Sequence, residues 1–169
     1  MSLPPLIEQV GVGPSGVYHL RAATAADQKA IKALIRAARI NPLGIDWRRF
    51  VVAVDAQGTL LGCGQVKLHR DGSRELASIA VARAWRKQGV ARTIIHYLLQ
   101  THPAPLWLTC LSRLIPFYAQ FGFREVADAA QMPPYFRRVY RLYNLFVRGQ
   151  RPEGYLAVMV RALNLWSPT

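Results

Sequence analysis

The spacing of apolar residues changes several times along the chain, and each change predicts a new element. Alternating or continuous apolar runs of four to eight residues predict strands, whereas apolar residues that recur every three to four positions predict helices. The predicted strands cover 17–22, 50–55, 59–69, 74–81, 106–110, 123–126 and 155–160. One predicted helix begins after residues 24–27 and a second begins after Gly89. Two more cover 113–121 and 135–147. Residues 1–16 lack a period, so we expect a flexible lead-in before a single domain, 17–169.

Local signals mark where some of these elements begin and turn. Thr24 and Asp27 have the spacing of a helix capping box, with the acid in its last place. The dipeptide Asp71-Gly72 is a hairpin signal, which predicts that 59–69 and 74–81 are antiparallel neighbours. In a regular strand, Glu75 and Ile79 would then lie on the same face.

The segment 86–92 joins a predicted strand to a predicted helix and contains Arg86, Lys87, Gly89 and Arg92. Free backbone N–H groups and the positive end of the helix dipole meet at such a junction. Gly89 allows the chain to approach a ligand closely. The basic side chains add positive charge at the same place. The sequence therefore predicts a pyrophosphate-binding turn.

Two motifs resemble signatures of the GCN5-related N-acetyltransferase (GNAT) superfamily. The first is Arg-x-x-Gly-x-Ala at 86–91, behind a strand that opens with Glu75. The second is aromatic-Tyr-x-x-x-Gly-Phe at 117–123. The resemblance covers nearly the whole chain beyond the lead-in. It implies an α/β (α+β) fold whose mixed, mostly antiparallel central sheet of about seven strands is flanked by helices. That sheet would be splayed between the fourth and fifth strands, where acetyl-CoA binds.

The resemblance also implies roles for individual residues. Glu75 matches the general base and Tyr118 the acid that protonates the departing thiolate. The backbone N–H of Ile79 matches the oxyanion donor, and Val81 matches the pantetheine contact. The residues that the resemblance assigns to the cofactor are Ile79, Ala80, Val81, Arg86, Lys87, Gln88, Gly89, Val90, Ala91 and Arg92.

Structural roles are the alternatives for both candidate catalytic residues. Glu75 could be a solvated strand acid or a partner of Arg74. Tyr118 could be a core aromatic residue beside Phe117 and Phe121. A narrower resemblance, to the acetyltransferase domain of N-acetylglutamate synthase, rests on 75–81, on Arg113 and on basic aromatic residues before the last strand. It implies an amino-acid acceptor whose carboxylate meets arginine.

Composition limits the other classes of function. The net charge of +13 suits a cofactor with several phosphates, and it argues against polyamines and lysine-rich tails as acceptors. Cys63 and Cys110 lack C-x-x-C spacing and the four histidines lack ligand spacing, so we expect no metal. No apolar run reaches the roughly 18 residues of a membrane span, and no signal peptide is recognisable. We therefore expect a cytoplasmic protein.

The helix at about 135–148 carries arginines beside tyrosines and phenylalanines. It could bind RNA or an anionic membrane surface. The simpler interpretation is that one apolar stripe packs on the sheet and the other on a second subunit of a homodimer. A nucleic-acid partner is therefore not the favoured prediction. The leading prediction is an acetyl-CoA-dependent N-acetyltransferase acting on the primary amine of a small molecule. A non-catalytic acyl-CoA sensor is the alternative that keeps the cofactor.

Overall fold

The fold was analysed in a computed structural model that describes residues 9–146 and 154–162. Within these residues eight strands form one sheet, in the order β1-β2-β3-β4-β5-β6-β8-β7. The strands are β1 (Gln9–Gly13), β2 (Gly16–Ala22), β3 (Phe50–Val54), β4 (Leu60–Leu68), β5 (Arg74–Val81), β6 (Leu106–Leu111), β7 (Arg124–Glu125) and β8 (Leu156–Arg161). The α-helices are α1 (Gln28–Ala37), α2 (Val90–Thr101), α3 (Ile115–Ala119) and α4 (Pro134–Phe146).

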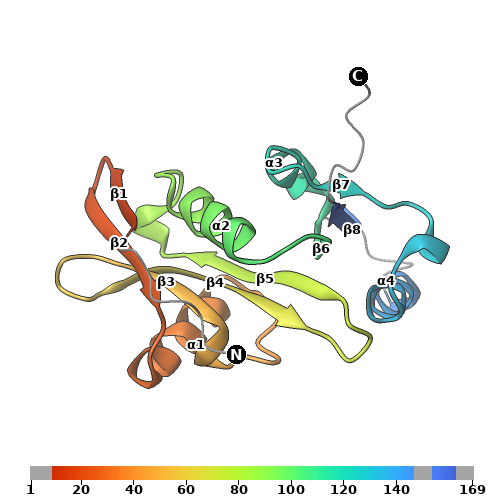
Figure 1. Ribbon diagram of the computed structural model, residues 1–169, viewed down its shortest axis with the longest axis horizontal. Coiled ribbons are helices and arrows are strands. Elements are labelled where there is room, and N and C mark those ends of the chain that lie inside the picture. The colour runs from red at the N-terminus through yellow and green to blue at the C-terminus, as the bar shows by residue number, and fades with distance from the viewer. Residues whose placement is uncertain (1–8, 147–153, 163–169) are drawn as a thin grey trace. The chain divides into compact units, whose positions relative to one another are not determined.

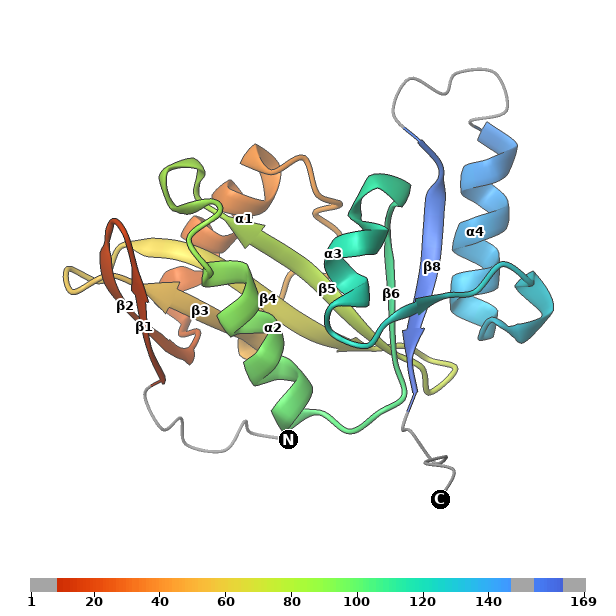
Figure 2. The same ribbon diagram turned by 90° about the horizontal axis from the view of Figure 1, so that it is seen from above.

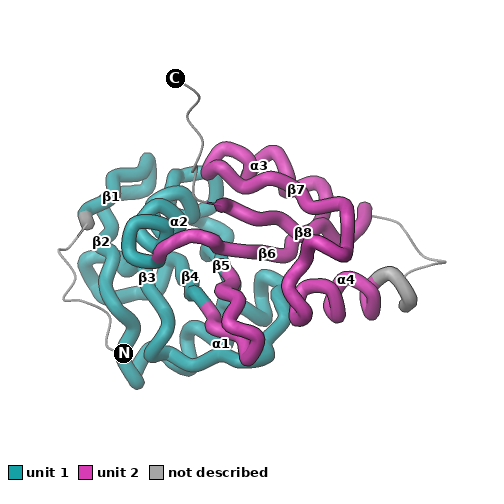
Figure 3. The backbone as a smooth tube through the Cα atoms, turned by 45° about the vertical axis from the view of Figure 1, so that its right-hand side comes forward, with its two compact units in different colours: residues 1–66, 76–102 teal, residues 67–75, 103–169 magenta. Residues whose placement is uncertain are grey.

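The chain divides into two compact units, which Figure 3 shows in different colours. Unit 1 comprises Met1–Val66 and Leu76–His102, and unit 2 comprises Lys67–Glu75 and Pro103–Thr169. The boundary falls within β4 and within β5, so each of these strands contributes residues to both units.

In unit 1, α1 and α2 cover opposite faces of the strands (Figure 1). Ile31 and Ile35 of α1 pack with Phe50, Val52 and Cys63 on one face. The other face is approached by α2, and glycine makes this approach possible. A Cβ on Gly64 of β4 would lie 2.6 Å from Cδ1 of Ile79 and 2.8 Å from Cγ2 of Ile94. A side chain at this position would push α2 away from the sheet.

The predicted capping box lies at the 3-10 turn η1 (Ala25–Asp27), which leads directly into α1. The Asp27 carboxylate accepts from the backbone N–H of Thr24 at 2.7 Å. It also accepts two hydrogen bonds from the Arg21 guanidinium, at 2.7 and 2.9 Å. Arg21 lowers the pKa of Asp27 below its ordinary value, because the guanidinium stabilises the ionised carboxyl.

Unit 2 is built on β6, β8 and β7, with α4 running alongside β8 (Figure 2). Strands β6 and β8 are antiparallel, with Thr109 opposite Val158. Phe136 of α4 is fully buried and packs with Met132, Val158 and Val160. The sequence of this helix has two apolar stripes, at 136/140/143/147 and at 135/139/142/146. Phe136 shows that the first stripe faces the strands. Leu142 of the second predicted stripe is exposed, and residues 147 and 148 lie outside the described part of the chain.

The predicted mixed, mostly antiparallel sheet is confirmed. Its parallel pair is β5 with β6, in register at Glu75 opposite Trp107. These are the two strands between which the GNAT resemblance implies the splay. β7 and the end of β8 match their predictions within two residues. β1 was not predicted, because it lies in the segment expected to be a flexible lead-in.

Candidate active site

The turn before α2 has the backbone form that an anion-binding loop requires. Gly89 is the N-cap residue of α2, with a φ of 86° in the left-handed region. The first helical bond of α2 runs from the Thr93 N–H to the Gly89 carbonyl, 3.0 Å away. The amides of Val90 and Ala91 precede that bond, so they have no acceptor within the helix. No side chain caps this end of α2. The amides are therefore available to an anionic ligand.

The turn is held in place by the hairpin of β1 and β2. The side-chain carbonyl of Gln88 accepts from the Ser15 N–H at 3.0 Å, and its amide donates to the Ala84 carbonyl at 2.7 Å. The Tyr18 hydroxyl lies 2.8 Å from the Thr93 hydroxyl. The sequence prediction missed Tyr18, and no pattern along the chain indicated that it supports this turn.

Three basic side chains surround the turn, and all are exposed: Arg86, Lys87 and Arg92. Lys87 has a φ of 62°, so the left-handed backbone includes a residue that rarely adopts it. The Arg86 Nε donates to the Val81 carbonyl at 3.3 Å. This bond ties the turn to the end of β5. These residues could hold the phosphates of CoA, because charge, free amides and an open backbone coincide there.

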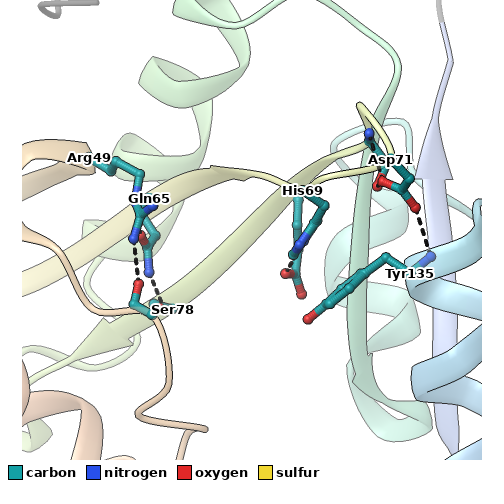
Figure 4. A network of polar contacts seen from close by, with 9 residues as sticks. Arg49, Gln65, His69, Asp71, Ser78 and Tyr135 are labelled. Atoms are coloured by element: carbon teal, nitrogen blue, oxygen red, sulfur yellow. Dashed lines mark hydrogen bonds and ion pairs between the residues drawn. The ribbon is translucent and has the colours of Figure 1, made fainter.

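Strand β5 is irregular where the resemblance places the thioester. Ser78 has a φ of 58°, so regular alternation does not run from Glu75 to Ile79 as expected. The Ser78 hydroxyl accepts from the buried Gln65 amide at 3.0 Å, and Gln65 accepts from Arg49 Nε at 3.3 Å (Figure 4). This network holds the local backbone before Ile79. Neither Gln65 nor Arg49 was assigned to the site from the sequence.

Glu75 is a buried carboxylate with a specific partner. Its Oε2 lies 2.9 Å from Nε2 of His69. Arg74 instead donates to the carbonyl of Pro103 at 3.3 Å. Glu75 is therefore neither solvated nor paired with Arg74, and its observed partner is His69. The sequence named no partner for His69, because the pairing depends on the register across the β4–β5 turn.

Tyr118 and Arg113 lie in unit 2 but differ in their surroundings. Tyr118 is partly buried on α3, edge-on to Phe117 at 5.1 Å and to Phe123 at 6.2 Å. Burial raises the pKa of its hydroxyl above the ordinary value, and the thiol of Cys110 adds to that shift. The hydroxyl therefore stays protonated at neutral pH, as an acid must. Arg113 is exposed in the turn η4 (Ser112–Leu114).

The candidate residues fall into two groups. Strand residues 79–81 and the turn 86–92 belong to unit 1, where Arg86 ties them together. Glu75, Tyr118 and Arg113 belong to unit 2. The sequence named the turn and Glu75 as candidates, but it did not indicate the side chains that contact each of them.

Comparison with known proteins identifies the fold. Residues 46–125 match the family model described as Acetyltransferase (GNAT) domain. The fold is that of the GNAT superfamily. The GNAT resemblance inferred from the two motifs is therefore confirmed. No match was found among curated proteins.

Several solved structures share this GNAT fold at low sequence identity. N-acetylglutamate synthase from Neisseria gonorrhoeae, solved with coenzyme A and N-acetyl-glutamate, is 21% identical, with a TM-score of 0.66. The match covers 86% of this chain and 35% of that one, so the chain spans about a third of the synthase. Rv2747 from Mycobacterium tuberculosis, solved with CoA, is 22% identical, with a TM-score of 0.63 over 85% of this chain and 98% of that chain.

A third relative, Escherichia coli ElaA, is 16% identical, with a TM-score of 0.60 over 85% of this chain and 97% of that chain. Together the GNAT match and these neighbours support an acyl-CoA-dependent N-acetyltransferase in general terms. Two of these neighbours were solved with coenzyme A bound. In the part of the chain that the structure describes, no helix is long and apolar enough to cross a membrane.

Proposed function

We propose that this protein transfers the acetyl group of acetyl-CoA to the primary amine of a small molecule, and that an amino acid is the acceptor class. The observation that carries the proposal is the turn before α2, where a left-handed Gly89 leaves the helix amides uncapped beside three exposed cations. Such a site suits a pyrophosphate. The solved neighbours with CoA support the same cofactor.

The acceptor class is supported by the neighbours' ligands and by the charge of the chain. Two of the neighbours that support the fold were solved with CoA, and one of these also held N-acetyl-glutamate. The net charge of +13 favours acceptors that carry a carboxylate over cationic polyamines. Arg113, exposed on η4, is the side chain that we propose to meet that carboxylate, since a guanidinium binds carboxylates through two parallel hydrogen bonds.

The chemistry assigns one task to each group. An ammonium must lose a proton before it attacks the thioester, and we assign that proton to Glu75. Negative charge then develops on the thioester oxygen, and we assign the backbone N–H of Ile79 as its donor. The departing thiolate needs a proton, for which Tyr118 is the proposed source. The Tyr118 hydroxyl is protonated at neutral pH and can supply this proton, but its raised pKa makes it a weaker acid than an ordinary tyrosine.

Two measurements test the proposal. Calorimetric titration with acetyl-CoA should show binding at micromolar concentration, and release of the CoA thiol should follow addition of L-glutamate, L-glutamine or another amine from a panel. The double variant Arg86→Ala/Lys87→Ala should bind acetyl-CoA at least tenfold more weakly, since each lost phosphate contact costs about 1 kcal/mol or more.

A matched control separates site-specific charge from net charge. Lys29→Ala/Lys32→Ala removes the same two charges from exposed positions on α1, so it should leave the affinity for acetyl-CoA within about twofold. Absence of binding by the unaltered protein would end the proposal. Binding without CoA release for any amine would favour the sensor instead.

A further inference from the structure

Arg49, Gln65 and Ser78 form a chain of hydrogen bonds whose direction is fixed. An arginine side chain can only donate, so the Arg49 Nε donates to the Gln65 carbonyl oxygen at 3.3 Å. The amide nitrogen of Gln65 then points the other way and donates to the Ser78 hydroxyl oxygen at 3.0 Å. Figure 4 marks both bonds with dashed lines. Because the Ser78 oxygen accepts this bond, its own proton is left to donate elsewhere.

Both ends of this chain carry donors that the protein does not use. The Arg49 Nη2 donates to the Gly44 carbonyl at 2.7 Å. A guanidinium has five N–H groups, so three of those on Arg49 have no acceptor among the described residues. The hydroxyl proton of Ser78 has no acceptor there either. Gln65 is fully buried between them, so a ligand at this place would meet hydrogen-bond donors.

The positive charge of Arg49 also lacks a counter-ion. The neighbouring Arg48 is exposed and pairs with Asp46 at 3.4 Å. Arg49 is partly buried, yet no carboxylate lies within ion-pair distance of it in the part of the chain that the structure describes. Its two contacts are with neutral carbonyl oxygens. A partly buried cation interacts more strongly with an anionic ligand than a solvated one does, because the local dielectric constant is lower.

The position of the chain separates such a ligand from the phosphates of the cofactor. Gln65 lies opposite Phe50 of β3, whose side chain packs with α1, so the network lies on the α1 face of the strands. The first turn of α2 carries the candidate phosphate site, and α2 covers the other face (Figure 1). Ser78 directly precedes Ile79, the proposed donor to the thioester oxygen. An anionic group at Arg49 would therefore belong to the acceptor.

We propose that Arg49 is a specificity-determining residue that binds the carboxylate of the acceptor amino acid, and that Gln65 and Ser78 hold its guanidinium in position. This inference rests on the proposed acetyltransferase function. The unused N–H groups of Arg49 donate to the carboxylate oxygens, and the opposite charges strengthen these bonds. The contact is independent of the one assigned to Arg113, which the experiment examines separately.

A purely structural role for Arg49 makes a different prediction. Its bond to the Gly44 carbonyl could serve only to hold the segment between α1 and β3. Loss of that bond would lower turnover with every amine alike. Loss of a carboxylate contact would lower it only for acceptors that carry the carboxylate. The preference for the acid over its neutral analogue therefore distinguishes the two roles.

The experiment measures this preference in wild type and in Arg49→Met. CoA release gives kcat/KM for the best amino acid of the panel, and for analogues in which a neutral carboxamide replaces one carboxylate at a time. The ratio of acid to analogue should fall at least about tenfold in Arg49→Met for one carboxylate, while the KM for acetyl-CoA stays unchanged. Every variant receives the same acceptors, so differences in the pKa of their amines cancel.

Matched variants test whether the effect belongs to this position. Arg48→Met removes the same charge from the adjacent, exposed residue and should leave the ratio within about twofold of wild type. Arg113→Met examines the other proposed contact. Thermal unfolding shows whether Arg49→Met is folded. If it is not, Arg49→Lys serves instead: it keeps the charge but loses the forked geometry, so the ratio should still fall several-fold.

The outcomes separate this inference from the proposed function. A lowered ratio in Arg49→Met supports it, whereas an unchanged ratio, or one that only Arg113→Met lowers, overturns it. Wild type that releases no CoA with any amine removes the proposed function first. Calorimetric titration with the same amino acids in the presence of CoA then decides the role of Arg49, because it requires no turnover. Binding at least about tenfold weaker in Arg49→Met supports that role, and equal affinity or no binding by wild type overturns it.

Discussion

At the scale of single residues, Gly89 and Ser78 both use left-handed backbone, but with different support. Gly89, with a φ of 86°, has no Cβ to strain and borders open space, since a Cβ there would come no closer than 3.9 Å to the Tyr18 hydroxyl. Ser78, with a φ of 58°, does have a Cβ, and its hydroxyl is held by Gln65. The cost of the serine conformation, about 1–3 kcal/mol, is offset by such contacts. The left-handed backbone at Ser78, held by Gln65, lies before residues 79–81, and that at Gly89 lies after them.

Gly89→Val should weaken acetyl-CoA binding at least tenfold. A β-branched residue is strained at a φ of 86°, so the turn would relax away from the form that presents the amides of α2. Calorimetric titration measures the affinity. Gly58→Val is a matched control, because Gly58 has a φ of 80° and nothing within 4 Å of an added Cβ. It should lose similar stability but keep its affinity, and equal affinity losses in both variants would contradict the proposed role of the turn.

Tyr118→Phe should lower turnover about 10²-fold and leave acetyl-CoA affinity unchanged, if the hydroxyl protonates the thiolate. Because burial raises the pKa of Tyr118, the hydroxyl keeps its proton as pH rises through about 10, the ordinary tyrosine value. Ionisation of Tyr118 should therefore not lower wild-type activity near pH 10. The pH profiles of wild type and Tyr118→Phe should have the same shape in that range. Unchanged turnover in the variant would leave Tyr118 as a packing residue of the aromatic cluster.

At the scale of elements, the sequence pattern predicted those strands and turns whose bounds are set by neighbouring residues in the chain. Strand β5 was predicted at its observed bounds, since an apolar run lies between the Asp71-Gly72 turn and a basic turn. β1 was missed because its glycines and weak alternation carry little strand signal, and pairing with β2 supplies what local preference lacks. The stack of Tyr135 on His69 joins residues far apart in sequence. Only tertiary packing determines that contact. The sequence therefore named Glu75 as a candidate but did not indicate the residues around it.

The capping box at η1 gives a prediction about stability. Asp27→Asn keeps the size of the side chain but loses the charge that binds Arg21, so the free energy of unfolding should fall by about 1–3 kcal/mol near pH 7. The folded pKa of Asp27 is lowered, chiefly by Arg21. Its contribution is therefore fully present above the unfolded value of about 3.9 and is lost as pH falls below it toward the folded pKa.

Urea unfolding at several pH values measures this effect. The difference between wild type and Asp27→Asn should be constant above about pH 5 and should shrink below about pH 4. Asp46→Asn is a suitable control, because its ion pair with Arg48 is 3.4 Å long and exposed. That variant should differ from wild type by less than about 1 kcal/mol at every pH. A gap for Asp27→Asn that widens in acid would refute the assigned sign.

At the scale of the whole molecule, charge and connectivity matter more than any single contact. The chain has 22 basic and 9 acidic residues, which produces a field that attracts polyanionic ligands. Salt screens that field, so association with acetyl-CoA should slow as ionic strength rises.

The connectivity of the chain affects folding. Since β4 and β5 each contribute residues to both units, loss of either strand removes part of each unit.

The two cysteines report on this connectivity, because Cys63 lies in unit 1 and Cys110 in unit 2. Burial raises the pKa of Cys63 to about 12 and that of Cys110 to about 11, so neither thiol should react at pH 8 in the folded protein. Unfolding exposes both thiols and returns them toward about 8.5, where a maleimide or disulfide reagent labels them quickly. Labelling across a urea series, read by peptide mass spectrometry, should give one shared midpoint, since strands common to both units couple their unfolding. Single Cys63→Ala and Cys110→Ala variants correct for any influence of one label on the other. If Cys110 became reactive at a lower urea concentration than Cys63, the units would unfold separately, and the shared strands would not be what makes the fold cooperative.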